Sequence, residues 1–193
     1  CGSGSAGHAS VPVEACSSRM NDSVDVVVIG GGAAGLMCAL TAGQRGRRVR
    51  VLEHANRVGK KILMSGGGRC NFTNTGTTAA NFLSANPHYC KSALARFKPA
   101  QFIELVERHG VAYHEKELGQ LFCDDSSKQI VRMLLDECEA GGVHIDTSCR
   151  VDGVERVDGG FVIHTVLGPI RTSALVVATC GLSIPSMGAT GFG

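Results

Sequence analysis

A glycine-rich segment and one carboxylate give the strongest chemical signal in this sequence. Gly30, Gly32 and Gly35 fit the spacing G-x-G-x-x-G, and Glu53 stands 18 residues beyond the last of them. The three glycines would allow a tight turn, the close approach of a diphosphate, and the packing of a helix on a strand. A carboxylate at this position accepts hydrogen bonds from ribose hydroxyls and repels a 2′-phosphate. The pattern therefore predicts a dinucleotide site that disfavours NADP.

The residues around this segment predict the strand–helix–strand unit that such a site needs. Val24–Ile29 is an apolar run interrupted only by Asp25, which is typical of a strand buried on both faces of a parallel sheet. Residues 33–45 have apolar side chains at helical spacing, and Val49–Leu52 reads as the second strand. The helix would begin at the glycines and direct its free N–H groups and partial positive charge at the phosphates.

A second glycine-rich stretch follows Glu53 and adds positive charge. It runs from Gly59-Lys60-Lys61 to Ser65-Gly66-Gly67-Gly68-Arg69-Cys70-Asn71. The backbone of such a loop can hydrogen-bond an extended dinucleotide, and plain NAD dehydrogenases seldom have a loop of this kind at this point of the fold. The stretch therefore favours FAD over NAD. The alternative is a flexible surface loop that happens to contain an arginine.

Beyond this stretch the sequence predicts helices, short strands and tight turns. Residues 54–90 form a long connection without clear structure, which in a compact domain is usually functional. The expected elements are helices at 99–109 and 126–140, a hairpin within 111–122, a strand at 143–145, a three-stranded meander at 151–157, 161–166 and 170–173, and a last apolar strand at 175–178 that returns to the parallel sheet. The predicted fold class is α/β, a Rossmann-type domain with a parallel sheet, flanking helices and an antiparallel β-meander.

The nine cysteines form no recognisable metal or redox motif. No CxxC pair and no Cys/His cluster with zinc spacing occurs, so we expect reduced thiols and no metal. Cys70 has no second cysteine nearby in the sequence, which favours a packing or backbone role over redox chemistry. The cysteines interpreted as small buried hydrophobic residues are Cys38, Cys90, Cys123, Cys138 and Cys149.

The composition is that of an ordinary globular domain with little net charge. The 193 residues are 44% hydrophobic and 19% charged, and the formal net charge is +2. Because Lys and Arg are scattered, we expect no nucleic-acid partner. The apolar run Val26–Ile29 is too short to span a bilayer, so we expect no membrane partner. The prediction is a cytoplasmic protein that acts on a small-molecule substrate, with the oligomeric state left open.

Both ends of the chain are unusual. Residues 1–19 are rich in Gly, Ser and Ala without periodicity, and we interpret 1–22 as a disordered extension, with Met20 as an alternative start. Cys1-Gly2-Ser3 also fits the lipid-bearing end of a mature lipoprotein, although no signal segment supports that interpretation. We expect residues 23–193 to form a dinucleotide-binding domain that is cut before it is complete.

Four segments carry a resemblance to a known family. They are VVVIGGGAAGLMCAL, GKKILMSGGGRCNFTN, FKPAQFIELVERHGVAYHEKELGQLFC and VVATCGLSIPSMGATGFG, of which the second and fourth are the more specific. From Asp25 to Gly193 the chain resembles the aminoacetone-oxidase-like family of NAD(P)/FAD-dependent oxidoreductases. The resemblance implies FAD contacts at Gly30, Gly32, Ala33, Ala34, Gly35, Glu53, Lys61, Gly67, Arg69, Cys70, Asn71, Val151, Ala178 and Thr179.

The resemblance also implies an activity. A flavin-dependent oxidoreductase of this family would transfer a hydride between flavin and a small organic substrate or NAD(P)H, with the chemistry supplied by the cofactor. No residue of this chain stands out as a general acid or base, so the catalytic residues are unknown. The alternatives are an NAD-dependent dehydrogenase and a non-catalytic dinucleotide-binding module.

The sequence departs from the family pattern at two places. The family usually has Ala-Thr-Gly-Gly where this chain reads Ala178-Thr179-Cys180-Gly181. We expect Cys180 to weaken FAD binding, because a glycine at that position would allow closer approach of the backbone. Family members also continue well beyond the position of Gly193, with an inserted domain and a final segment beside the flavin. We therefore expect residues 23–193 by themselves to be an incomplete FAD-binding domain and an inactive fragment.

Overall fold

The first strand, helix and second strand form the expected unit at the centre of the protein. The computed structural model describes residues 23–179 and 181. Strand β1 (Val24–Ile29) leads into helix α1 (Ala33–Gln44), and β2 (Val49–Leu52) returns parallel to β1. Val27 and Val28 of β1 are fully buried, which explains why this strand is a continuous apolar run.

Six strands form one mixed sheet in the order β6-β2-β1-β9-β8-β7. Strand β6 (His144–Asp146) extends the parallel half beside β2. Strands β7 (Val151–Val157), β8 (Gly160–Thr165) and β9 (Gly168–Val177) form the antiparallel meander that the sequence predicted. The predicted α/β fold class is confirmed.

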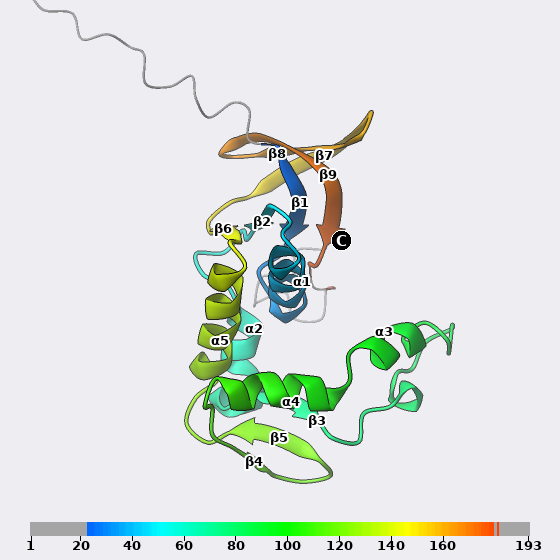
Figure 1. Ribbon diagram of the computed structural model, residues 1–193, viewed down its shortest axis with the longest axis vertical. Helices are drawn as coiled ribbons and strands as arrows, with labels where there is room; N and C mark the ends of the chain where they lie inside the picture. The colour runs from blue at the N-terminus through cyan, green and yellow to red at the C-terminus, as the bar shows by residue number, and fades with distance from the viewer. Residues whose placement is uncertain (1–22, 180, 182–193) are drawn as a thin grey trace, which may run out of the picture.

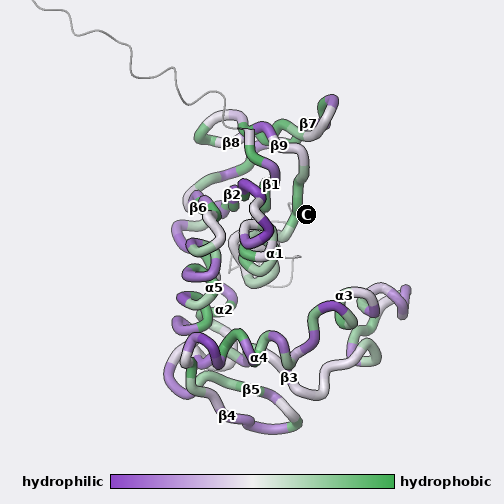
Figure 2. The backbone as a smooth tube through the Cα atoms, in the orientation of Figure 1, coloured by the Kyte–Doolittle hydropathy of each residue, from purple (hydrophilic) through white to green (hydrophobic). Residues whose placement is uncertain are grey.

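Strand β9 corrects one detail of the prediction. The expected strands at 170–173 and 175–178 are one continuous strand, Gly168–Val177. Its first half pairs antiparallel with β8, and its second half pairs parallel with β1. In Figure 2 the end of β9 nearest the C label is hydrophobic and lies close to α1. A single strand thus joins the meander to the parallel sheet, because its two edges meet different neighbours.

The main core lies where α1 meets α5 (Lys128–Ala140), the amphipathic helix that the sequence predicted at 126–140. Leu36 of α1 and Met133 and Leu134 of α5 are almost fully buried. The two helices approach closely near their C-terminal ends because residue 43 is a glycine. Any Cβ at this position would lie only 2.6 Å from the carbonyl oxygen of Gly141.

A small antiparallel sheet lies at the far end of the molecule from the large one (Figure 1). It has the order β3-β5-β4, with bounds Asn71–Asn74, Gln120–Cys123 and Tyr113–Glu115. Helix α4 (Pro99–Arg108) covers it, and the rings of Phe72, Phe102 and Tyr113 pack together there. The predicted hairpin is β4–β5, whereas β3 was missed because its four residues show no alternation.

The connection at 54–90, expected to lack structure, contains several short helices, and another follows it. Those within it are α2 (Lys60–Met64) and the 3-10 turns η1 (Ser65–Gly68) and η2 (Ala79–Asn81), and the one that follows is α3 (Lys91–Arg96). Pieces this short have no hydrophobic period to detect, and tertiary contacts decide them. The extension predicted for 1–22 lies outside the described residues. No helix in the described part of the chain is long and apolar enough to cross a membrane.

Candidate dinucleotide-binding site

The turn after β1 can be built only with glycine at two of its positions. Gly30 has φ +109°, and a Cβ there would lie 2.8 Å from the carbonyl oxygen of Ala178. A Cβ on Gly35 would lie 1.9 Å from the carbonyl oxygen of Gly30. The first and last glycines of the motif therefore serve the fold, because they let α1 start directly against β1 and the end of β9.

Gly32 differs from these two glycines because no described residue occupies the space beside it. A Cβ on Gly32 would meet no atom of residues 23–179 or 181 within 4 Å. Gly32 is the N-cap of α1, no side chain caps the helix, and the N–H of Leu36 is the one that bonds to the Gly32 carbonyl. The N–H groups of the first turn, with exposed Ala33 and Ala34, thus border open space, which is the geometry of an anion site.

Glu53 stands beside this turn with its carboxylate held in place. Its side chain is only 8% exposed. One carboxylate oxygen accepts the Gly31 N–H at 2.8 Å, and the other accepts the Ala55 N–H at 2.8 Å. The same second oxygen lies 3.1 Å from Nδ1 of His54. These contacts hold the Glu53 carboxylate, with its negative charge and its acceptor oxygens, in one position next to the N-terminus of α1.

Gly31 has a structural role that sequence reasoning missed. Besides donating to Glu53, it accepts the Gly59 N–H at its carbonyl oxygen, at 2.9 Å. A Cβ on Gly31 would lie 2.6 Å from a methyl carbon of Val58 and 3.1 Å from the Glu53 carboxylate. One sign of this role was present in the sequence: the motif G-x-G allows any residue between its first two glycines, and this chain has a glycine there. Gly31 thus joins the turn, the carboxylate and the start of α2.

The end of β9 meets the glycine-rich turn from the other side, as the sequence predicted for Ala178 and Thr179. The Ala178 N–H donates to the Ile29 carbonyl oxygen at 2.8 Å, directly before Gly30. The Thr179 hydroxyl is buried and has no hydrogen-bond partner among the described residues. Cys180, where the sequence departs from the family, lies outside the described residues. An unsatisfied buried hydroxyl beside the turn fits a site that takes a polar ligand.

The second glycine-rich stretch begins at the turn and then leaves it. Gly59 is bonded to Gly31 and caps α2, which carries Lys61. The loop after α2 has positive φ at Gly66, Gly67, Gly68 and Cys70. It is tied down by the Ser127 N–H on the Gly68 carbonyl and the Cys123 N–H on the Arg69 carbonyl. The loop is therefore ordered by α5 and β5 rather than free on the surface.

The predicted contact residues of this loop differ in their exposure to solvent. Gly67, Arg69 and Asn71 are exposed, and a Cβ on Gly67 would meet no atom within 4 Å. Cys70 is 5% exposed and belongs to the main core. Its side chain therefore has a packing role, and a contact to a ligand would have to come from its backbone.

The segment just before Val151 runs beside Glu53. The Cys149 N–H donates to the Glu53 carbonyl oxygen at 2.9 Å and the Ser148 N–H to the Ala55 carbonyl oxygen at 2.7 Å. Val151 opens β7 and packs on the smaller core cluster. Contact between Val151 and a bound adenine stays a prediction.

Most of the cysteines in the described residues are buried, and this burial predicts how their thiols react. Cys90, Cys123, Cys138 and Cys149 are buried as predicted, while Cys38 is half-buried. Burial raises the pKa of the Cys123 and Cys138 thiols to about 11. At about pH 8 such a thiol is thiolate in roughly one molecule per thousand, far less than a free cysteine. Within the described residues, no group of three or more His, Cys, Asp or Glu could hold a metal ion.

We therefore expect Cys123 and Cys138 to resist a thiol reagent in the native protein and to react fully in denaturant. The experiment is labelling at about pH 8 followed by peptide mass mapping. Cys38, which is half-buried, is the internal comparison because burial raises its pKa as well but leaves part of its surface accessible. Rapid native labelling of Cys123 or Cys138 would contradict the burial of these side chains.

The fold and the turn together define a class of protein. A parallel sheet with a glycine turn, an open helix N-terminus and a carboxylate at the end of β2 is a Rossmann-type dinucleotide-binding domain, built like those of FAD-binding oxidoreductases. Residues 24–193 match the model of the HI0933-like protein Rossmann domain, and the chain belongs to that family. The aminoacetone-oxidase-like resemblance is thus confirmed at the level of the Rossmann family.

Two relatives by sequence and one solved structure of the same fold are similar to this chain. It is 53% identical over 169 residues to a ribosomal RNA dihydrouridine synthase of Escherichia coli, covering 88% of this chain and 42% of that protein. It is 28% identical to a 3-dehydro-bile acid delta(4,6)-reductase of Clostridium scindens, covering 86% and 41%. The chain thus spans less than half the length of these relatives. Glycine oxidase of Geobacillus kaustophilus shares the fold, with a TM-score of 0.57 at 18% identity over 80% of this chain and 55% of that one.

Proposed function

We propose that this chain is the FAD-binding domain of a flavin-dependent reductase whose substrate is a uridine in ribosomal RNA. The open space beside Gly32, next to the buried Glu53 carboxylate, is the observation that carries the proposal. A diphosphate would find uncommitted N–H groups there, and a ribose would find a fixed acceptor. The unsatisfied hydroxyl of Thr179 lies at the same turn.

Different residues of the chain would bind different parts of FAD. In this proposal the first turn of α1, from Gly32 to Gly35, holds the pyrophosphate, and Glu53 holds the ribose of the adenosine half. Val151 borders the adenine, while Lys61 and the loop from Gly67 to Asn71 lie along the extended cofactor. The flavin itself would supply a hydride donor and acceptor.

The choice of a reductase rather than an amine oxidase comes from the relatives. The name of the 53% identical protein describes the formation of dihydrouridine in ribosomal RNA, and the 28% identical protein is named a reductase. Making dihydrouridine adds one hydride and one proton across a carbon–carbon double bond of uridine. NAD(P)H is the proposed source of the hydride, and the cytoplasm, where ribosomal RNA is found, is the proposed location.

This proposal departs from the expectation of a small-molecule substrate without nucleic acid. That expectation rested on a net charge of +2 for the whole chain. Net charge is an average over all surfaces, so it does not exclude a local basic region. An RNA substrate is therefore compatible with the same composition.

The experiment uses the full-length protein that contains this chain. We expect it to purify with bound flavin, visible as yellow absorbance, and to oxidise NAD(P)H when unmodified ribosomal RNA is added. Nucleoside mass spectrometry should detect dihydrouridine after the reaction. A colourless protein that binds NAD would favour an NAD-dependent dehydrogenase, and flavin binding without any turnover would favour a non-catalytic module. Either result would contradict the proposal.

A further inference from the structure

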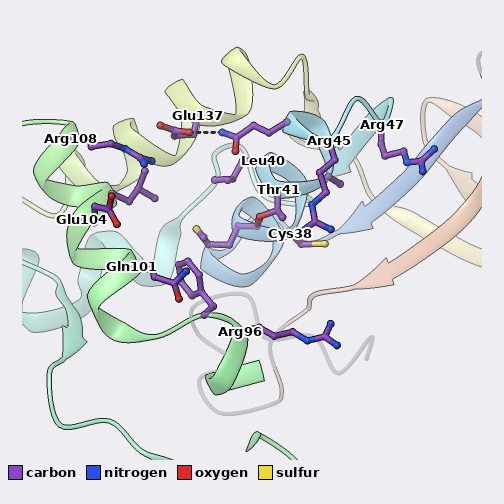
Figure 3. A pocket seen from close by; sticks show the side chains of 15 residues that line it. Cys38, Leu40, Thr41, Arg45, Arg47, Arg96, Gln101, Glu104, Arg108 and Glu137 are labelled. Atoms are coloured by element: carbon purple, nitrogen blue, oxygen red, sulfur yellow. Dashed lines mark hydrogen bonds between the residues drawn. The ribbon is translucent and has the colours of Figure 1, made fainter. Parts of the chain in front are cut away.

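A cleft with a volume of about 970 Å³ lies between α1 and α4, and we call it the α1–α4 cleft (Figure 3). Its walls are the C-terminal half of α1, the face of α4 that turns toward it, the Arg96–Phe97 link before α4, and Glu137 of α5. The cleft is separate from the dinucleotide site. Gly32 caps one end of α1 and Arg45 the other, and a helix of 12 residues is about 18 Å long.

Two of the arginine side chains at this cleft have no carboxylate partner among the described residues. Elsewhere in the structure, exposed and half-buried arginines form ion pairs with aspartates at 2.6 to 3.0 Å, namely Arg48, Arg50, Arg132 and Arg150. Of the four exposed arginines of the cleft, Arg108 adds its charge to the His109 hydrogen bond that lowers the pKa of Glu137, and Arg47 adds its charge to the Arg48 hydrogen bonds that lower the pKa of Asp25. The guanidinium groups of the other two, Arg45 and Arg96, present forked donors that suit phosphate oxygens.

Two carboxylates also line the cleft, so its charge must be counted. Glu137 already accepts hydrogen bonds from the side chains of His109 and Gln44. Glu104 lies on α4 one turn before Arg108. Four cations against two anions leave an excess of two positive charges at the cleft.

The floor of the cleft is apolar rather than charged. Met37 and Leu40 of α1 face Leu105 of α4, and the Phe97 ring is 43% exposed at the edge. Gln101 of α4 also lines the cleft (Figure 3). A cationic rim over an apolar floor with an accessible ring is the composition of grooves that hold single-stranded nucleic acid, where phosphates meet arginines and bases stack on aromatic rings.

We propose that the α1–α4 cleft binds the phosphate backbone of a single-stranded stretch of the RNA substrate. This inference rests on the proposed function, because it names the surface that would hold the RNA while a uridine is reduced elsewhere. Arg45 and Arg96 come from separate elements and carry the phosphate contacts, and the exposed Phe97 ring, which lines the same cleft, offers a stacking surface.

The test compares the full-length protein with R45A/R96A and with R156A as a matched control. Arg156 of β7 is also exposed and without an ion pair among the described residues, but it lies outside the cleft. RNA affinity is measured by fluorescence anisotropy with a single-stranded ribosomal RNA fragment at several salt concentrations. Losing two phosphate contacts should lower affinity roughly 10- to 30-fold at ~0.1 M salt and make the salt slope shallower by about 1.4. R156A should bind as the unaltered protein does.

Further readouts separate this inference from the proposed function. R45K/R96K should recover most of the affinity, and bound flavin and melting temperature should stay unchanged in every variant. Equal affinity and slope in R45A/R96A would overturn the cleft assignment, even if the unaltered protein makes dihydrouridine. Loss of flavin or a lower melting temperature would also overturn it, because the cleft would then be an internal docking surface. If the unaltered protein fails to make dihydrouridine, the proposed function is rejected. The comparison of RNA affinities would still decide whether the cleft binds RNA.

Discussion

Replacing Gly35 by alanine is expected to destabilise the protein by at least about 3 kcal/mol, at the upper end of the usual cost of overpacking. The new Cβ would lie 1.9 Å from the carbonyl oxygen of Gly30. That oxygen belongs to the backbone, so no side-chain rotation relieves the clash, and α1 must move away from β1. Thermal unfolding of the full-length protein without cofactor should show a melting temperature lower by roughly 3–6 °C, for a protein about twice as long as this chain.

Gly32→Ala is the matched control, with the opposite pattern of effects. Its Cβ would meet no atom of the described residues within 4 Å, so the melting temperature of the cofactor-free protein should be nearly unchanged. The methyl group would instead project into the space where we propose the pyrophosphate lies, and flavin should be lost. A Gly32→Ala protein that keeps stoichiometric flavin would reject that placement. A Gly35→Ala protein of normal stability would contradict the packing of α1 on β1.

Glu53→Ala is expected to weaken FAD binding by roughly 1.5–3 kcal/mol, the usual cost of losing a hydrogen bond to a charged group. This corresponds to an increase in the dissociation constant of about 10- to 100-fold. The structure gives a second reason for a loss, because the carboxylate also holds the N–H groups of Gly31 and Ala55 at 2.8 Å. Titration of the cofactor-free full-length protein with FAD measures the change.

Glu53→Gln removes the charge of this side chain while keeping its shape. The amide oxygen can accept only one of the two backbone N–H groups, and the NH2 group would face the other, so stability should fall by about 1–3 kcal/mol, the cost of an unsatisfied buried donor. The charge is gone, so the ribose contact should weaken and the discrimination against a 2′-phosphate should fall. An unaltered dissociation constant for FAD in both variants would refute the assignment of Glu53 to the ribose.

The sequence alone predicted the parts of this protein that local patterns encode. The buried strand β1, the glycines that follow it and Glu53 at the end of β2 needed only spacing and residue type, because each has one physical task in a strand–helix–strand unit. The amphipathic helix α5 was predicted for the same reason, since its apolar face repeats at helical spacing.

Only the tertiary structure decided how distant segments meet. Strand β9 is one strand because β1 and β8 pair with its opposite edges, and no local signal marks that. In the sequence, Gly31, Gly32 and Gly35 look alike, although in the structure Gly32 borders open space and the other two are crowded. They differ because Val58 and Glu53 lie against Gly31, and Gly30 and Ala178 against Gly35, while no described residue lies beside Gly32. The unpaired arginines are likewise far apart in the sequence and share one cleft only after α1 and α4 have packed.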